Sequence, residues 1–175
     1  FHAAPVPHTL SVPRRLQPLE AFDLEPVECM RLQDALPTGF FWGDCWQGNV
    51  LVSQDQIYFV DPIANRWLFD VEATVANAGI DLAMLYMSVL FCHPLHRLAL
   101  LDSNMLVETA EAMLWAYLDA ASARGVATTI RRLARQLAVR YIDTCRFRLP
   151  APIALLRRHA SHRILGKVDD MLDWS

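Results

Sequence analysis

The sequence lacks paired cysteines and zinc-binding motifs. Its four cysteines form no C-x-x-C pair and no zinc-type spacing, and apolar or aromatic residues lie near each of them in the sequence. We therefore expect free thiols, buried or incidental, in a reducing compartment, the cytoplasm. The sequence also lacks a segment long enough to cross a bilayer, because its longest apolar run, residues 80–92, stops at Pro94. No stable membrane insertion is expected.

The chain does contain enough apolar sequence for one folded domain, with 54% hydrophobic and 20% charged residues. Its charge is unevenly divided: residues 1–123 carry 5 basic and 15 acidic side chains, and residues 124–175 carry 11 and 4. Three interpretations remain open: docking of one part on the other, a basic surface for an anionic partner, and a solvated arginine-rich helix face. The arginine run at 131–148 carries no nucleic-acid motif, so no nucleic-acid partner is expected.

Local patterns predict an α+β chain that is mainly α, with a small β-hairpin followed by a helical bundle. Prolines indicate that residues 1–24 are a linker or a segment that wraps the domain. Gly125 is expected to stop the helix at about 104–123, and Pro150 and Pro152 are expected to separate the helices at about 128–146 and 153–165. The expected elements are helices at about 27–35, 80–92 (buried), 104–123, 128–146 and 153–165, strands at 40–42, 50–52 and 57–60, a turn at 53–56 and a loop at 62–79.

The expected hairpin brings polar side chains together at one end. With a turn at 53–56, Val52 faces Ile57, so Asn49 lies opposite Val60 and next to Asp61. An amide oxygen and a carboxylate at one place suit Mg²⁺. Asp44 lies on the loop that leads to the same end, where a carboxylate can accept a proton from a substrate hydroxyl.

These residues carry a family resemblance. The string from Trp42 to Val52, WGDCWQGNVLV, resembles the catalytic loop H-G-D-x-x-x-x-N-[IVL]-[LV] of aminoglycoside phosphotransferases and of their choline, fructosamine and homoserine kinase relatives. Residues 57–62 are similar to the strand before the family's second metal-binding aspartate, and residues 79–83, GIDLA, to its D-L-A motif. The resemblance covers about residues 25–95. It implies that residues 25–175 form a protein kinase-like C-terminal lobe.

The resemblance also implies a role for each polar residue. Asp44 would be the catalytic base, and Asn49 and Asp61 would hold Mg²⁺ against the phosphates of ATP. Asp81 would brace the catalytic loop by accepting hydrogen bonds from loop backbone N–H groups. The acceptor would be a hydroxyl of a small molecule. In the alternative interpretation, Asp44 and Asn49 only cap turns and Asp81 is a helix N-cap.

Several features depart from the family pattern. Trp42 replaces the usual histidine, and Lys167 is the one lysine of a chain that has no glycine-rich loop, so the ATP clamp of an N-terminal lobe is absent. Because the chain begins with Phe1, we expect a piece of a longer polypeptide that supplies this lobe, and little or no turnover by the piece alone. A catalytically incomplete pseudokinase or binding module is the alternative. Residues 79–94 also resemble lipopolysaccharide kinases and KEOPS-type kinases, which leaves a lipid-linked sugar or a protein as acceptor.

Overall fold

The computed structural model describes residues 18–40, 42–43, 45–53, 56–60, 75–91, 102–145 and 151–173. These residues are mainly helical and form two antiparallel strand pairs, which agrees with the expected α+β, mainly α class. The elements are η1 (Pro18–Ala21), α1 (Pro26–Ala35), β1 (Thr38–Phe40), η2 (Gln47–Asn49), β2 (Val50–Ser53), β3 (Gln56–Phe59), β4 (Val75–Asn77), α2 (Ala78–Phe91), α3 (Ser103–Ala120), η4 (Arg124–Val126), α4 (Ala127–Cys145) and α5 (Ala151–Asp173). None of the described helices is both long and apolar enough to span a bilayer.

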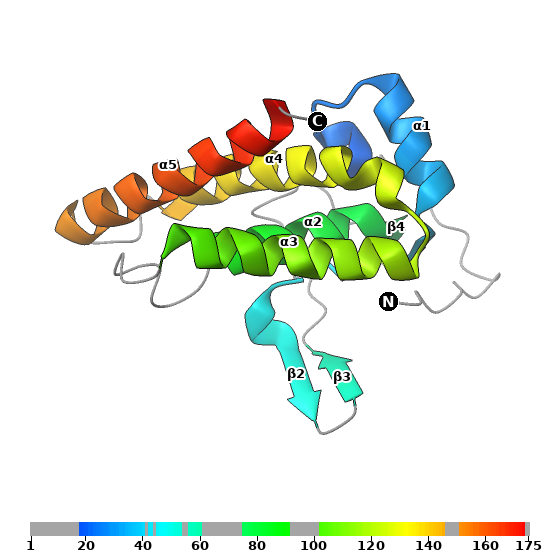
Figure 1. Ribbon diagram of the computed structural model, residues 1–175, viewed down its shortest axis with the longest axis horizontal. Helices are drawn as coiled ribbons and strands as arrows, with labels where there is room; N and C mark the ends of the chain where they lie inside the picture. The colour runs from blue at the N-terminus through cyan, green and yellow to red at the C-terminus, as the bar shows by residue number, and fades with distance from the viewer. Residues whose placement is uncertain are drawn as a thin grey trace.

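Helix α2 is the centre of the core. It is buried on nearly every side, as its uniformly apolar sequence predicts, and α3 and α4 pack on it. Helix α5 in turn packs on α3 and α4 (Figure 1). The buried residues of α3 recur every four positions, which gives one apolar stripe facing α2: Leu106, Ala110, Leu114 and Leu118.

The reversal after α3 differs from the expectation. Gly125 does not end the helix, because α3 stops at Ala120 and Ser122 adopts the left-handed backbone conformation, with φ of 54°. The Ser122 N–H donates to the Asp119 carbonyl, and the Ala123 N–H donates to the Leu118 carbonyl at 2.8 Å. This pair of bonds is the Schellman arrangement, formed here around a serine instead of a glycine.

One strand prediction and one loop prediction are wrong. The predicted loop at 62–79 contains β4, and the strand expected at 40–42 begins earlier, at Thr38. The two strands pair antiparallel, with Thr38 opposite Asn77 and Phe40 opposite Val75. Strands of three residues show no alternating pattern, and partners this far apart in sequence meet only in the tertiary structure.

The last helix is longer than expected at both ends. Pro152 lies inside the first turn of α5, where a missing N–H costs no helical hydrogen bond. Beyond residue 165 the helix continues because Val168 is buried and because Asp169 forms an ion pair with Arg135 of α4.

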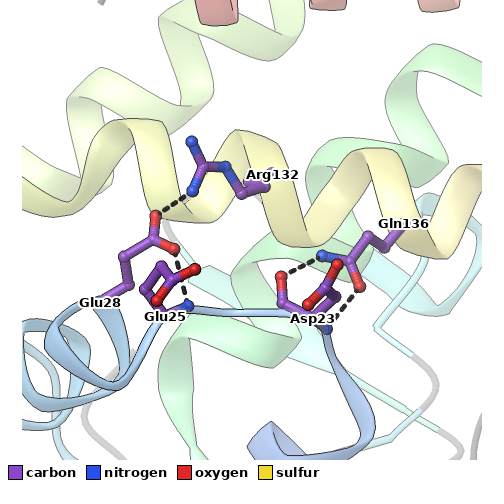
Figure 2. A network of polar contacts seen from close by, with 5 residues as sticks. All are labelled: Asp23, Glu25, Glu28, Arg132 and Gln136. Carbon is purple, nitrogen blue, oxygen red and sulfur yellow. Dashed lines mark hydrogen bonds and ion pairs between the residues drawn. The ribbon is translucent and has the colours of Figure 1, made fainter.

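Residues 18–24 pack against the helical body in the manner of a wrapping segment; residues 1–17 lie outside the described part. Leu19 and Phe22 are buried in the main core. The Asp23 N–H donates to the Gln136 side-chain oxygen at 3.0 Å, and the Gln136 amide donates back to the Asp23 carbonyl at 2.9 Å (Figure 2). Arg140 donates to the Ala21 carbonyl and lies over the ring of Phe22.

The arginines of α4 hold other elements in place. Arg132 pairs with Glu28 of α1 at 2.6 Å, and Glu28 also accepts a 3.0 Å bond from the Glu25 N–H at the start of α1 (Figure 2). Arg131 pairs with Glu111 of α3. These two pairs and the bond from Arg140 to Ala21 join α4 to the acidic part of the chain and favour the docking interpretation of the divided charge, whereas Arg135 pairs with Asp169 inside the basic part. Arg146 and Arg148 lie outside the described residues.

Candidate functional site

The register of the hairpin formed by β2 and β3 is as predicted. Val52 faces Ile57, and Val50 faces Phe59. One step further, the Val60 N–H donates to the Asn49 carbonyl at 2.9 Å. Asn49 and Val60 are therefore partners at the open end of the hairpin. Asp61, the next residue in the sequence, lies outside the described residues.

The loop that leads to this end is bound to the first turn of α2. The Trp42 N–H donates to Asp81 Oδ2 at 2.9 Å, and the Gly43 N–H donates to Asp81 Oδ1 at 3.0 Å. Gly43 has φ of 73°, which glycine adopts without steric cost. One buried carboxylate thus holds two consecutive backbone amides of the loop. This is the contact that the resemblance implies for Asp81, whereas Asp44, which follows in the sequence, lies outside the described residues.

A second side chain of α2 binds the far end of the loop. The Gln47 N–H donates to Ser88 Oγ at 3.1 Å, and Ser88 Oγ donates to the Leu85 carbonyl at 2.8 Å. Ser88 is seven residues after Asp81, so both side chains lie on the same face of α2. Sequence reasoning missed Ser88. The available signal was a second polar residue at helical spacing from Asp81 in an otherwise apolar helix.

The turn before Asn49 is closely packed. The Asn49 N–H donates to the Trp46 carbonyl at 2.9 Å, which closes η2. A Cβ atom built on Gly48 would overlap the indole ring of Trp46, so a larger residue there would displace the indole. Asn49 itself is only 8% exposed. The amide side chain at the hairpin end is therefore held in a defined, mostly buried place.

The electrostatic state of Asp81 reflects its burial. Loss of solvation raises the pKa of Asp81 to about 6, and the two N–H bonds from Trp42 and Gly43 oppose part of that rise. Tyr117 of α3 lies near this carboxyl: burial, and then the charges of Asp81 and Cys45, raise its pKa. The protein therefore places an acid with a near-neutral pKa beneath the loop.

The N-cap interpretation of Asp81 is wrong, because Asn77 caps α2. Asn77 Oδ1 accepts a 2.9 Å bond from the Gly79 N–H, while its Nδ2 donates to the Leu36 carbonyl at 2.8 Å and to the Leu32 carbonyl at 3.2 Å. One side chain thus joins the end of α1 to the start of α2. A Cβ on Gly79 would lie 2.9 Å from Leu32 Cδ1, so the close approach requires glycine. Sequence reasoning missed Asn77, although asparagine is a favoured N-cap.

A second buried polar cluster connects α2, α3 and α4. The Tyr86 hydroxyl donates to Glu111 Oε1 at 2.6 Å, and Arg131 Nε donates to the same oxygen at 2.8 Å. The Arg131 guanidinium also lies over the Trp115 ring, 5.3 Å from its centroid. Although burial opposes it, hydrogen bonding by Arg131 and Tyr86 lowers the pKa of Glu111 overall, whereas burial raises that of Tyr86. Every polar group named here has a partner, which indicates a structural cluster.

Of the four predicted site residues, Asn49 and Asp81 are described, and Asp44 and Asp61 are not. In the described ranges, no three His, Cys, Asp or Glu side chains gather as metal ligands. Lys167 contacts Asn104 of α3. No protein-family model, curated protein or solved structure matches the chain.

Proposed function

We propose that the chain is the C-terminal lobe of an ATP-dependent phosphotransferase that moves the γ-phosphoryl group to a hydroxyl of a small molecule. The observation that carries the proposal is the double hydrogen bond from Trp42 and Gly43 to Asp81. It fixes the backbone on one side of Asp44, the proposed catalytic base. A base must be held within hydrogen-bond reach of its substrate, and a braced backbone supports that requirement.

The pairing of Asn49 with Val60 supports the proposed magnesium site. It brings residue 60 beside Asn49, and Asp61 follows directly in the sequence. Asn49 offers an amide oxygen from a buried, well-held position, which fits the oxygen ligands of Mg²⁺. In the proposal, Asn49 and Asp61 hold the ion, which when bound neutralises charge on the phosphates of ATP.

The hairpin surface supports the need for a further lobe. Four large apolar side chains on it are exposed by about half or more: Leu51 52%, Val52 78%, Ile57 63% and Tyr58 49%. Figure 1 shows the hairpin extending away from the helices. Exposed apolar groups gathered on one element indicate a contact surface. We propose that the N-terminal lobe of a longer polypeptide covers it and supplies the lysine that contacts the nucleotide phosphates.

The engagement of Lys167 favours one alternative. This single lysine contacts Asn104 on α3 and is therefore engaged within the helical bundle. Without a lysine from another lobe, the chain would be a pseudokinase or binding module. It would then present the apolar hairpin to a partner and transfer no phosphate.

The test is a phosphotransfer assay of the longer polypeptide with Mg²⁺, ATP and a panel of small hydroxyl compounds. Asp44→Ala is expected to lower kcat by about a hundredfold or more, the usual effect of losing a general base. Asp34→Ala, which removes an exposed carboxylate from α1, is the matched control and should retain activity. Equal activity of wild type and Asp44→Ala would reject the base. Absence of both turnover and ATP binding in the longer polypeptide would favour the binding module.

A further inference from the structure

The two basic helices near the end of the chain differ in how their charges are compensated. In α4, Arg131, Arg132 and Arg135 each pair with a carboxylate. In α5, Arg158 and Arg163 are exposed, and neither has an acidic partner among the described residues. These α4 arginines hold the fold together, whereas Arg158 and Arg163 leave their charge to the solvent.

Between residues 155 and 163, the exposed basic side chains of α5 lie on one face of the helix, and the exposed Asp170 and Asp173 follow only near its end. Its exposed side chains follow helical spacing over two turns, and this set is named the α5 basic face: Leu155, Arg158, His159, His162 and Arg163. Arg158 Nε donates to His162 Nε2 at 3.4 Å, which keeps the two side chains together. The opposite side of the helix is buried and includes Ala160, Ser161 and Ile164. The α5 basic face is therefore exposed to solvent, on the side of the helix opposite to the one that packs on the bundle.

The sequence around this face is free of acidic residues. Between Asp143 and Asp169 there are six Lys and Arg residues, two histidines and no Asp or Glu. Figure 1 shows the first turns of α5 (orange) reaching past the ends of α3 and α4. An unbalanced positive field on a projecting helix attracts negatively charged partners.

We propose that the α5 basic face docks on an anionic lipid surface. Charge complementarity favours an anionic partner. The exposed side chain of Leu155 favours a lipid surface over a nucleic acid. This side chain is 67% exposed beside Arg158 and His159, which suits insertion among lipid headgroups flanked by basic residues. Nucleic-acid surfaces commonly add aromatic side chains that stack on bases, and the α5 basic face has none. This inference goes beyond the proposed phosphotransferase and does not depend on it.

The test is co-sedimentation of the 175-residue chain with vesicles of phosphatidylcholine, alone or mixed with phosphatidylserine. Binding is expected only to the anionic vesicles and should fall as salt is raised. Each basic residue near such a surface contributes about 1 kcal/mol, so Arg158→Gln and Arg163→Gln should each weaken the partition coefficient roughly fivefold, and together about 30-fold. Leu155→Ser should weaken binding with little change in its salt dependence.

Two controls make the assignment specific. Arg31→Gln removes one exposed arginine from α1 and should leave vesicle binding unchanged. Arg158→Lys keeps the charge and should retain most of the binding. Equal losses for Arg31→Gln and Arg158→Gln would overturn the proposal, because net charge alone would then explain binding. Equal binding to neutral and anionic vesicles, no binding to either, or displacement from vesicles by single-stranded RNA would also overturn it.

Discussion

Asp81 is the residue whose contribution to stability the structure determines most directly. Its side chain is 4% exposed, and burial raises its pKa from 3.8 to about 6. A carboxyl with a raised pKa binds a proton in the folded state at pH values where the unfolded state has already lost it. The free energy of unfolding therefore falls as pH rises from about 4 to about 6. A shift of about two pKa units corresponds to about 3 kcal/mol.

The variant Asp81→Asn isolates this contribution. Its side chain has one carbonyl oxygen, so it can accept only one of the bonds from Trp42 and Gly43, and the lost bond costs about 1–3 kcal/mol. It also carries no charge to desolvate. At about pH 4 the variant should be less stable than wild type by the cost of the lost bond. At about pH 8 wild type must bury an ionised carboxylate and the variant buries a neutral amide, so the avoided desolvation should offset that cost.

The measurement is urea unfolding followed by tryptophan fluorescence at several pH values between about 4 and about 8. The free energy of unfolding of wild type minus that of the variant should change by about 2–3 kcal/mol over this range, and wild type should lose its advantage as pH rises. Subtraction removes the titration of all other groups. Asp34→Asn, on the exposed side of α1, controls for the loss of one carboxylate. A difference that stays constant, or that grows in favour of wild type at high pH, would refute the reasoning.

Two further changes test the packing around the site. Arg131→Met leaves the half-buried Glu111 carboxylate without its charged partner and should cost about 3 kcal/mol in urea unfolding, more than the double variant Glu111→Leu/Arg131→Met. Arg132→Met breaks a pair in which the arginine is 43% exposed, so it should lower the free energy of unfolding less than Arg131→Met does. A loss as large as that of Arg131→Met would contradict this expectation. Gly79→Ala places a methyl 2.9 Å from Leu32 Cδ1 and should cost about 1–3 kcal/mol; an unchanged urea midpoint would show that the junction of α1 and α2 yields easily.

Much of the fold follows from local sequence. The apolar run of α2, the helical spacing in α3 and α4, and the two β-rich runs around a polar turn predict elements within three residues of those observed. The register of the hairpin also follows, because a short turn fixes which residues face each other. These features depend on neighbours a few residues apart, and the printed sequence contains that information.

The candidate site was only partly predictable. Asp81 was singled out through a resemblance, whereas the long-range contacts of Ser88 and Asn77 were missed because nothing local marks the distant partners. Those partners are backbone groups 41 residues away in each case. A polar residue in an apolar helix indicates that a partner exists, but not which one.

The sequence by itself determined helices α2, α3 and α4, the hairpin and its register, since these depend on periodicity and turn length. Only the tertiary structure decided that β1 pairs with β4, that Asn77 joins the end of α1 to α2, and that Arg131 and Arg132 of α4 hold α3 and α1 while Arg158 and Arg163 of α5 face solvent. Each of these outcomes depends on which groups far apart in the chain become neighbours. That choice is made by burial of the whole core, because charges and backbone amides removed from water must find partners wherever packing brings them.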